Sequence, residues 1–133
     1  MTVIIEYPEY NDAAAGLIKR IKGLDVSFST NAEGKQIKIE LPDIYYFENV
    51  ERKLFIYTEK EVFRFDSKMT ELEELTKDTP LVRVSRTCIM NTDHLKEIRQ
   101  VRNSHLEALL DNGEMLIVSR KYLKDIKNVF GRR

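Results

Sequence analysis

Apolar and polar residues alternate along much of the chain beyond residue 35, and this alternation predicts β-strands. In residues 36–41 the apolar positions 37, 39 and 41 alternate with charged ones, which is the period of a half-buried strand. Residues 105–118 are expected to form a hairpin, because Asn112-Gly113 readily adopts positive φ. The secondary structure of residues 87–91 is ambiguous from the pattern, and one helical turn is the interpretation kept here. Further strands are expected at residues 44–47, 54–58, 61–65, 81–84, 95–101, 106–110 and 115–118.

Helical spacing of apolar residues occurs in two segments of this region. Ser67 precedes apolar residues at positions 69, 72 and 75, so a short helix is expected there, with its glutamates 71, 73 and 74 on a solvated face. The last element is predicted to be a helix that is capped by Ser119 and ended by Gly131. The residues of this last helix that should face the core are Tyr122, Leu123, Ile126, Val129 and Phe130.

Residues 1–34 are predicted to form a small β-α-β unit, with dimerisation or partner docking as its hypothetical role. A strand is expected at residues 3–7, a helix at 13–22, and a second strand at 25–30. The following loop is the expected boundary to a second domain, residues 35–133. Hairpins favour antiparallel pairing, so the predicted fold class is mainly β with short helices (α+β).

Length and composition limit the class of protein. The 133 residues suffice for a core without disulfides or metal, and 42% hydrophobic residues is too many for a disordered chain. No run approaches the roughly 18 apolar residues of a membrane-spanning helix. The first residues also lack the pattern of a secretory signal, so a cytoplasmic location is expected. A single cysteine and two histidines argue against a disulfide within the chain and against a metal site.

No group of residues resembles a catalytic site, so the chain is predicted not to be an enzyme and to need no cofactor. The glycines are scattered and do not form a phosphate-binding loop. Cys88 with His94 or His105 would be a conceivable nucleophile and base. However, Cys88 lies in an apolar stretch, which favours a buried and inert thiol. A redox role for Cys88 is kept as a hypothesis, because the residue follows a basic segment.

The formal charge is zero, with 22 basic and 22 acidic residues, but the two parts of the chain differ. Residues 1–80 contain 11 basic and 16 acidic residues, a net charge of −5, whereas residues 81–133 contain 11 and 6, a net charge of +5. Such asymmetry hints at a nucleic-acid or membrane surface. Scattered solvated charges would give the same totals, so the hint depends on local motifs.

Two basic segments lie at the ends of predicted strands or in loops. Ser85 and Arg86 follow a predicted strand. The planar fork of an arginine pairs with guanine edges or with phosphate, and a hydroxyl serves backbone oxygens. Arg52 and Lys53 lie in a predicted loop. Taken alone, the first segment is better explained as a surface strand with an ion pair, and the second also has an ordinary surface interpretation.

A third basic segment, Arg120-Lys121, falls in the first turn of the predicted last helix. Cations there are unfavourable by about 0.3–1 kcal/mol each, because the positive end of the helix dipole prefers acids. A phosphate bound at the free N–H groups would remove this conflict. The basic pair therefore favours an anion-binding role over an ordinary surface position. Lys124 follows one turn later. A fourth basic set comprises Lys96, Arg99, Arg102 and Asn103. It is weaker evidence for a binding site, because its alternation fits the solvent-exposed face of a strand.

Four motifs, in order and spacing, make residues from about 35 to 130 similar to the LytTR-type DNA-binding domain family. The first motif is Asp-Ile-Tyr-Tyr-Phe-Glu at residues 43–48. The second is Leu-Val-Arg-Val-Ser-Arg-Thr-Cys-Ile-Met-Asn at residues 81–91. The third is the hairpin at Asn112-Gly113, and the fourth is Val-Ser-Arg-Lys-Tyr at residues 118–122.

The resemblance implies an elongated arrangement of antiparallel sheets whose loops enter successive major grooves. It also implies binding to paired promoter repeats, often as a homodimer. Asn91 would be structural, and Arg83 would support a loop. The groove-facing candidates by position are Arg52 or Lys53, Ser85, Arg86 and Arg120, while Lys121 and Lys124 would fix the register on the DNA backbone.

Two departures from the family pattern matter. Many members have histidine or asparagine near positions 85 and 86, so a different base sequence is expected here. The common arrangement places this domain behind a phosphorylatable receiver, and residues 1–34 are too short for one. The chain is therefore more similar to stand-alone members, which are often encoded beside a small membrane protein that inhibits them.

The predicted function is sequence-specific binding of double-stranded DNA by a transcriptional regulator that works as a homodimer, at least on DNA. The alternative is a protein-interaction module that is regulated by a membrane partner, with DNA binding secondary.

Overall fold

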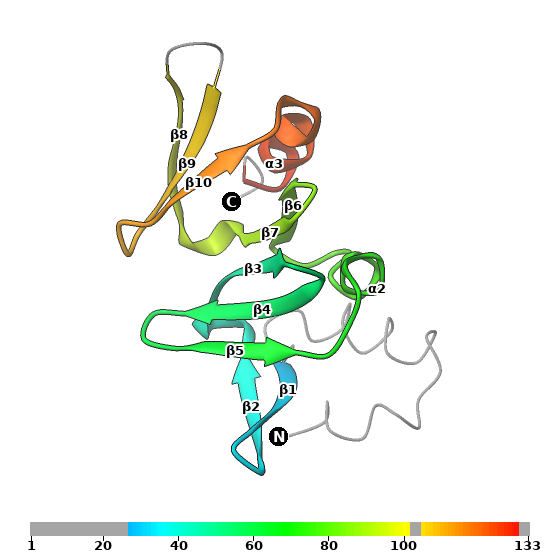
Figure 1. The fold of residues 1–133 in the computed structure, drawn as a ribbon. Coiled ribbons are helices and arrows are strands. Elements are labelled where there is room, and N and C mark those ends of the chain that lie inside the picture. Colours follow the sequence, from blue (N-terminus) through cyan, green and yellow to red (C-terminus); the bar gives the residue numbers. More distant parts are fainter. Residues whose placement is uncertain (1–26, 102–104, 131–133) are drawn as a thin grey trace.

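A five-stranded antiparallel sheet forms the centre of the molecule (Figure 1). The structure is a computed structural model that describes residues 27–101 and 105–130. The order of the strands is β5 (Val62–Phe65), β4 (Lys53–Thr58), β3 (Ile44–Val50), β7 (Cys88–Asn91) and β6 (Leu81–Ser85). Strand β3 is the central one, and its pairing with β7 places Tyr46 opposite Met90 and Phe47 opposite Ile89.

Each face of this sheet packs against its own hydrophobic core. On one face, Tyr46, Val84 and Met90 pack against a second antiparallel sheet and a helix. That sheet consists of β8 (Leu95–Val101), β9 (His105–Leu110) and β10 (Met115–Val118), and the helix is α3 (Leu123–Phe130). The helix contributes the fully buried Ile126.

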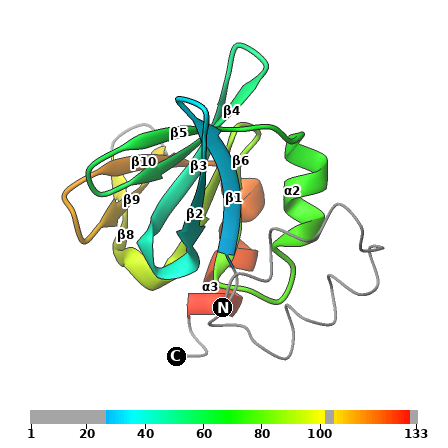
Figure 2. The ribbon, with the colours of Figure 1, turned by 90° about the horizontal axis from the view of Figure 1, so that it is seen from below.

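On the other face, Phe47 and Ile89 pack against a hairpin and a helix. The hairpin is β1 (Ser27–Ala32) with β2 (Lys35–Glu40), and the helix is α2 (Met69–Leu75). The result is an elongated stack of layers, mostly β (Figure 1). Figure 2 shows the β1–β2 hairpin in front of the central sheet and α2 beside it.

Burial on both faces explains why β3 and β7 lack the alternation of the outer strands. The apolar runs at residues 44–47 and 88–90 are buried throughout. A short apolar run without a period does not distinguish a helix from a strand that is covered on both sides. The interpretation of residues 87–91 as one helical turn is therefore wrong, since Cys88–Asn91 is the strand β7.

The loop that was expected to separate two domains is the turn of the β1–β2 hairpin. Strand β1 corresponds to the strand expected at residues 25–30 and pairs with β2 from Ser27 to Ala32. Its Phe28 lies 5.2 Å from Phe47 and 5.6 Å from Phe65, ring centre to ring centre. This strand thus contributes to the core of the central sheet. The strand expected at residues 3–7 and the helix expected at 13–22 lie outside the described residues.

The last helix begins later than the sequence suggests. A 3-10 turn, η5 (Arg120–Tyr122), follows β10, and α3 starts at Leu123 with Asp125 in its first turn. The Ser119 side chain makes no capping hydrogen bond. The expected Ser119 cap, and with it the expected basic first helical turn, are corrected: an acidic residue occupies the first turn of α3, and Arg120 and Lys121 precede the helix.

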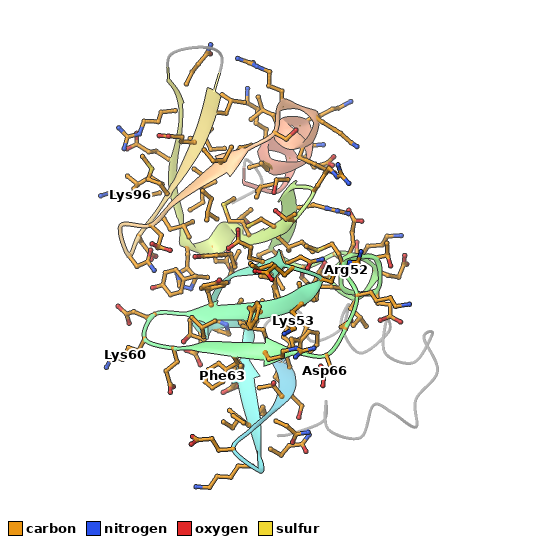
Figure 3. All side chains as sticks on the ribbon, in the orientation of Figure 1. Arg52, Lys53, Lys60, Phe63, Asp66 and Lys96 are labelled. Carbon is orange, nitrogen blue, oxygen red and sulfur yellow. The ribbon has the colours of Figure 1, made fainter. Side chains whose placement is uncertain are left out.

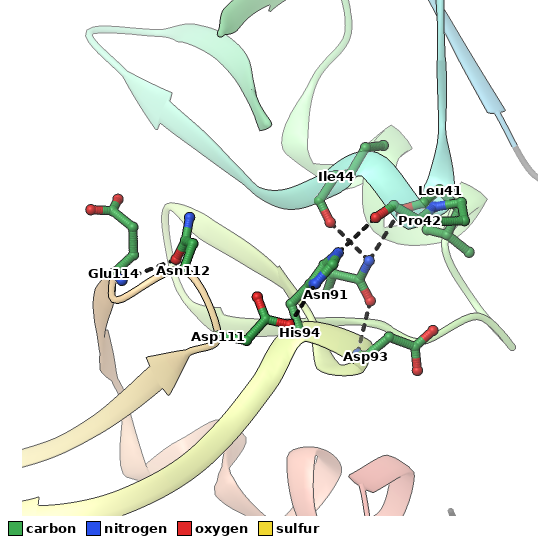
Figure 4. Close-up of polar contacts among 9 residues, drawn as sticks. All are labelled: Leu41, Pro42, Ile44, Asn91, Asp93, His94, Asp111, Asn112 and Glu114. Carbon is green, nitrogen blue, oxygen red and sulfur yellow. Dashed lines mark hydrogen bonds and ion pairs between the residues drawn. The ribbon is translucent and has the colours of Figure 1, made fainter. Parts of the chain in front are cut away.

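A buried polar junction joins the two sheets (Figure 4). Asn91 is fully buried, and its amide donates to the carbonyls of Leu41 (3.1 Å) and Ile44 (2.8 Å) while its Oδ1 accepts from the N–H of Asp93 (2.9 Å). The structural role expected for Asn91 is thereby confirmed. Two further 3-10 turns lie beside it, η2 (Leu41–Asp43) and η3 (Thr92–His94).

His94 extends this junction to the β9–β10 turn. Its Nε2 lies 2.7 Å from the carbonyl oxygen of Pro42, and its Nδ1 lies 3.0 Å from Oδ2 of Asp111. The imidazole also stacks on Tyr45, with 3.9 Å between ring centres. The neighbouring Tyr46 donates from its hydroxyl to Glu114 across 2.8 Å. These contacts fix the second sheet on the first.

Within the described residues, no helix is both long and apolar enough to cross a membrane.

Candidate nucleic-acid interface

Three turns that are far apart in the sequence lie together along one edge of the molecule, on the right in Figure 1. They are the β3–β4 turn at residues 51–52, the β6–β7 turn at residues 86–87, and η5. The N–H of Asn49 donates to the carbonyl of Thr87 across 2.8 Å, which joins the first turn to the second. The N–H of Ser119 donates to the carbonyl of Val84 across 2.8 Å, which joins the third to the second.

We call the basic and hydroxyl side chains on or beside these turns the cationic rim: Arg52, Lys53, Ser85, Arg86, Arg120, Lys121 and Lys124. Its arginines and lysines are exposed, and none forms an ion pair within the described part of the chain. Lys121 lies over the Tyr122 ring, with 5.3 Å from Nζ to the ring centre. The turns that carry or adjoin the side chains singled out from the sequence therefore lie on one edge, and no carboxylate of the described residues lies within ion-pair distance of these cations.

The β3–β4 turn places Arg52 at the tip of a two-residue hairpin (Figure 3). Glu51 and Arg52 have φ values of 52° and 69°, the left-handed region that favours glycine or asparagine. Val50 pairs with Lys53 across the turn, so Lys53 opens β4 next to the tip. A charged residue therefore occupies a backbone position that glycine would fit with less strain.

The β6–β7 turn is held from behind by Arg83. Its Nε donates to the carbonyl of Ser85 (3.0 Å) and its Nη2 to the carbonyl of Arg86 (2.6 Å). Its Nη1 donates to Oε1 of Glu73 on α2 (2.9 Å). The supporting role expected for Arg83 is confirmed by these contacts. The side chain of Arg86 is exposed, and the partly exposed hydroxyl of Ser85 accepts from the N–H of Thr87 (3.3 Å).

Glu73 and Tyr122 are contacts of the rim that the sequence did not identify. Glu73 was expected on a solvated helix face, but it pairs with Arg83, and its side chain is only 45% exposed. Tyr122 was expected in the core, but its half-buried ring lies 5.8 Å from the Arg83 guanidinium carbon. Nothing in the spacing of Glu73, Arg83 and Tyr122 could have paired them, because three separate elements bring them together.

The thiol of Cys88 lies directly behind the β6–β7 turn and is buried. Burial, and secondarily the charge of Glu48, raises the pKa of this thiol well above its usual range. The thiolate is the reactive form of cysteine, so the geometry argues against the redox hypothesis and supports the expectation of an inert thiol.

The fourth basic set does not belong to the rim. Lys96 and Arg99 lie on β8, and Figure 3 shows Lys96 on the opposite side of the molecule from Arg52. Arg99 is exposed beside Met115 of β10. These positions agree with the interpretation that this set lies on the solvent-exposed face of a strand. Arg102 and Asn103 lie outside the described residues.

Comparison with known proteins identifies the family. The model of the LytTr DNA-binding domain matches residues 34–131. The sensory transduction protein LytT of Enterococcus faecalis is 30% identical over 89 residues, which cover 67% of this chain and 37% of that protein. The transcriptional regulatory protein BtsR of Escherichia coli is 43% identical over 60 residues, or 45% of this chain and 25% of that protein.

A solved structure from Bacillus cereus, described as the LytTr DNA-binding domain of a "putative methyl-accepting/DNA response regulator", has the same fold. The TM-score is 0.70 at 23% identity, covering 79% of this chain and 96% of that one. By contrast, the chain spans only 25% to 52% of the length of the curated relatives LytT and BtsR. Since the family model covers most of the chain and the fold agrees, this chain belongs to the LytTR family of DNA-binding domains.

Proposed function

We propose that this protein is a transcriptional regulator that binds a specific double-stranded DNA sequence, with the turns of the cationic rim entering successive major grooves. The observation that supports this most strongly is the joining of three distant turns into one edge by the backbone bonds Asn49–Thr87 and Ser119–Val84. A major groove is about 12 Å wide and admits a two-stranded ribbon, so hairpin tips of this kind fit without a recognition helix.

The side chains of the rim divide into two roles. Arg86 and Arg120 would read base edges, because an arginine fork pairs with two acceptors of guanine. Arg52, Lys53, Lys121 and Lys124 would contact phosphates and fix the register, releasing counterions as they bind. The hydroxyl of Ser85 would contact a base or a backbone oxygen.

A chain with zero formal charge has weak long-range attraction for DNA, so one copy is expected to bind modestly. We therefore propose that two copies bind adjacent repeats, since the second contact then profits from a high effective concentration.

The test begins with selection of bound fragments from a pool of random duplexes, followed by mobility shifts on the selected sequence. Arg86→Ala and Arg120→Ala should each weaken specific binding by about 1–3 kcal/mol, which is the discrimination of one good arginine–guanine contact. Lys121→Ala should weaken all sequences alike and reduce the salt slope by about one.

Lys96→Ala is the matched control, because it removes an exposed cation from the opposite side of the molecule. Binding by Arg86→Ala and Arg120→Ala that equals the binding of Lys96→Ala, with the same salt slope, would show that the proposed surface is wrong. Retention on heparin by a chain that stays monomeric in light scattering would favour nucleic acid over a protein partner. Weak retention with self-association would favour the alternative of an interaction module.

A further inference from the structure

Arg83 differs from the other arginines of this edge because its hydrogen bonds are directed into the protein. Its side chain is only 18% exposed, and the bonds described above go to the carbonyls of Ser85 and Arg86 and to the carboxylate of Glu73. Nε, Nη1 and Nη2 each have a protein partner. Arg83 is thus engaged before any ligand arrives.

The two carbonyls that Arg83 binds belong to the turn that presents Ser85 and Arg86. The pairing of β6 with β7 shifts register between Arg83 and Ser85, so the ladder alone does not fix this part of the backbone. A planar guanidinium with donors at fixed angles can hold two carbonyls at once, whereas a lysine presents a single ammonium. The conformation of the turn therefore depends on the orientation of this one group.

Two further side chains set that orientation. Glu73 of α2 accepts from Nη1 at 2.9 Å, a charge-assisted bond that is stronger than a neutral one. The centre of the Tyr122 ring of η5 lies 5.8 Å from the guanidinium carbon, and the same ring is contacted by Lys121. Tyr122 belongs to the same 3-10 turn as Arg120. The contact between Arg83 and Tyr122 therefore links the two turns that carry the candidate base-reading arginines.

We infer that Glu73, Arg83 and Tyr122 form a brace that holds the β6–β7 turn and η5 in the geometry needed to read a base sequence. The inference rests on the proposed function, and it assigns specificity to three positioning residues rather than to further DNA contacts. Preorganised contact groups lose less conformational entropy on binding, so the brace raises affinity for the correct sequence above affinity for any other.

Glu73 gives the sharpest test, because simple electrostatics and the brace predict changes in DNA affinity of opposite sign when this carboxylate is removed. Removing a carboxylate near a DNA-binding edge should strengthen binding to all DNA. Loss of the brace should instead weaken binding to the selected sequence, by about tenfold if one charge-assisted hydrogen bond is lost. Glu73→Ala should therefore reduce the ratio of specific to non-specific affinity.

Glu74→Ala is the matched control on the same helix. It removes the same charge from a side chain that is 70% exposed and forms an ion pair with Lys77 across 3.1 Å. Its ratio of specific to non-specific affinity should equal that of the parent. Equal behaviour of Glu73→Ala and Glu74→Ala would overturn the brace.

Arg83→Gln separates positioning from phosphate contact because it removes the cation, whereas a lysine would keep the charge and leave the salt slope unchanged in either case. A positioning role predicts loss of specific affinity with an unchanged salt slope, whereas a direct phosphate contact predicts a slope reduced by about one. Tyr122→Phe keeps the ring and should match the parent, while Tyr122→Leu should resemble Glu73→Ala. A slope reduced by about one in Arg83→Gln would overturn the assignment of Arg83 as a positioning residue.

A measurement on the free protein distinguishes failure of the brace from failure of the proposed function. In NMR spectra of the 133-residue chain without DNA, the Arg83 Nε–H should exchange slowly. Glu73→Ala, but not Glu74→Ala, should accelerate this exchange and shift the backbone signals of residues 85–87. Equal spectra for the two variants would refute the brace even if the parent binds DNA, and absence of any selected sequence would refute the proposed function alone. Thermal unfolding of each variant verifies that it is folded.

Discussion

The polar junction between the sheets and the cationic rim both consist of polar or charged side chains, but these side chains are used in opposite ways. At the junction, Asn91 and His94 direct their hydrogen bonds to other parts of the protein. At the rim, Arg52, Arg86 and Arg120 have exposed side chains and no ion pair within the described residues.

This difference separates stability from recognition. A buried polar group that loses its partner costs the full desolvation of that group, so the junction has little tolerance for change. An exposed cation without a partner contributes little to folding and remains available for an anionic ligand. The brace around Arg83 is intermediate, because it is half-buried but holds groups of the rim.

The largest expected effect is at the junction. Asn91→Ala leaves the carbonyls of Leu41 and Ile44 and the N–H of Asp93 without their side-chain partner, and should lower the free energy of unfolding by about 3 kcal/mol. Asn112→Ala is the control, because this exposed turn residue only accepts from the N–H of Glu114 and should cost less than about 1 kcal/mol. Urea unfolding measures both, and similar losses would contradict the distinction between the two regions.

The second effect is a loss of stability at alkaline pH that originates between the sheets. Burial raises the pKa of Tyr46 and of Cys88 in the folded state, and the hydrogen bond to Glu114 adds to the shift for Tyr46. In the unfolded chain these groups have ordinary pKa values of 10.0 and 9.0. Because the folded state retains protons that the unfolded state releases, stability is fully present below about pH 9 and falls as the pH rises further.

For Cys88 alone, the free energy of unfolding should decrease by up to about 1.4 kcal/mol per pH unit above this point. Urea midpoints between pH 7 and pH 11 measure the slope. Cys88→Ala and Tyr46→Phe should each make it shallower, whereas Arg86→Ala at the rim should not. A flat profile for the parent protein would show that these groups are not held neutral by the fold.

The smallest expected effect has the opposite sign and lies at the rim. Arg52→Gly removes a side chain from a residue with φ of 69° and should stabilise the protein by about 0.5–1 kcal/mol, since non-glycine residues are strained there. Arg52→Ala keeps the strain and should not stabilise. Both variants should weaken DNA binding alike, because both lose the cation. A destabilised Arg52→Gly in thermal unfolding would mean that the side chain supports the turn.

Strands with one solvated face were predictable from sequence, and those with two covered faces were not. The alternation in β2 directly indicates a half-buried strand, with Ile39 on its buried side. Residues 88–91 have no such period because β7 is covered by both cores. Ser119 has the chemistry and the extended backbone of a helix cap, but its hydroxyl makes no capping hydrogen bond, and the 3-10 turn η5 follows it before α3 begins at Leu123.

For the candidate site, the chemistry could be predicted but the geometry could not. Basic residues at strand ends and family-like motifs identified the rim, since exposed cations in turns have a sequence signature. The pairing of Glu73 with Arg83 depends on where α2 packs against the central sheet, which no local pattern encodes. The hypothesis of a reactive Cys88 loses its basis because neighbouring strands bury the sulfur.

The strand pair β3–β7 is shared by both hydrophobic cores, one on each side of it. Neither core can be lost while the other remains intact, because loss of either one would expose a buried face of the same two strands to water. Unfolding of the described residues should therefore be a single cooperative event, and the distance between the three turns should stay constant until the whole structure melts.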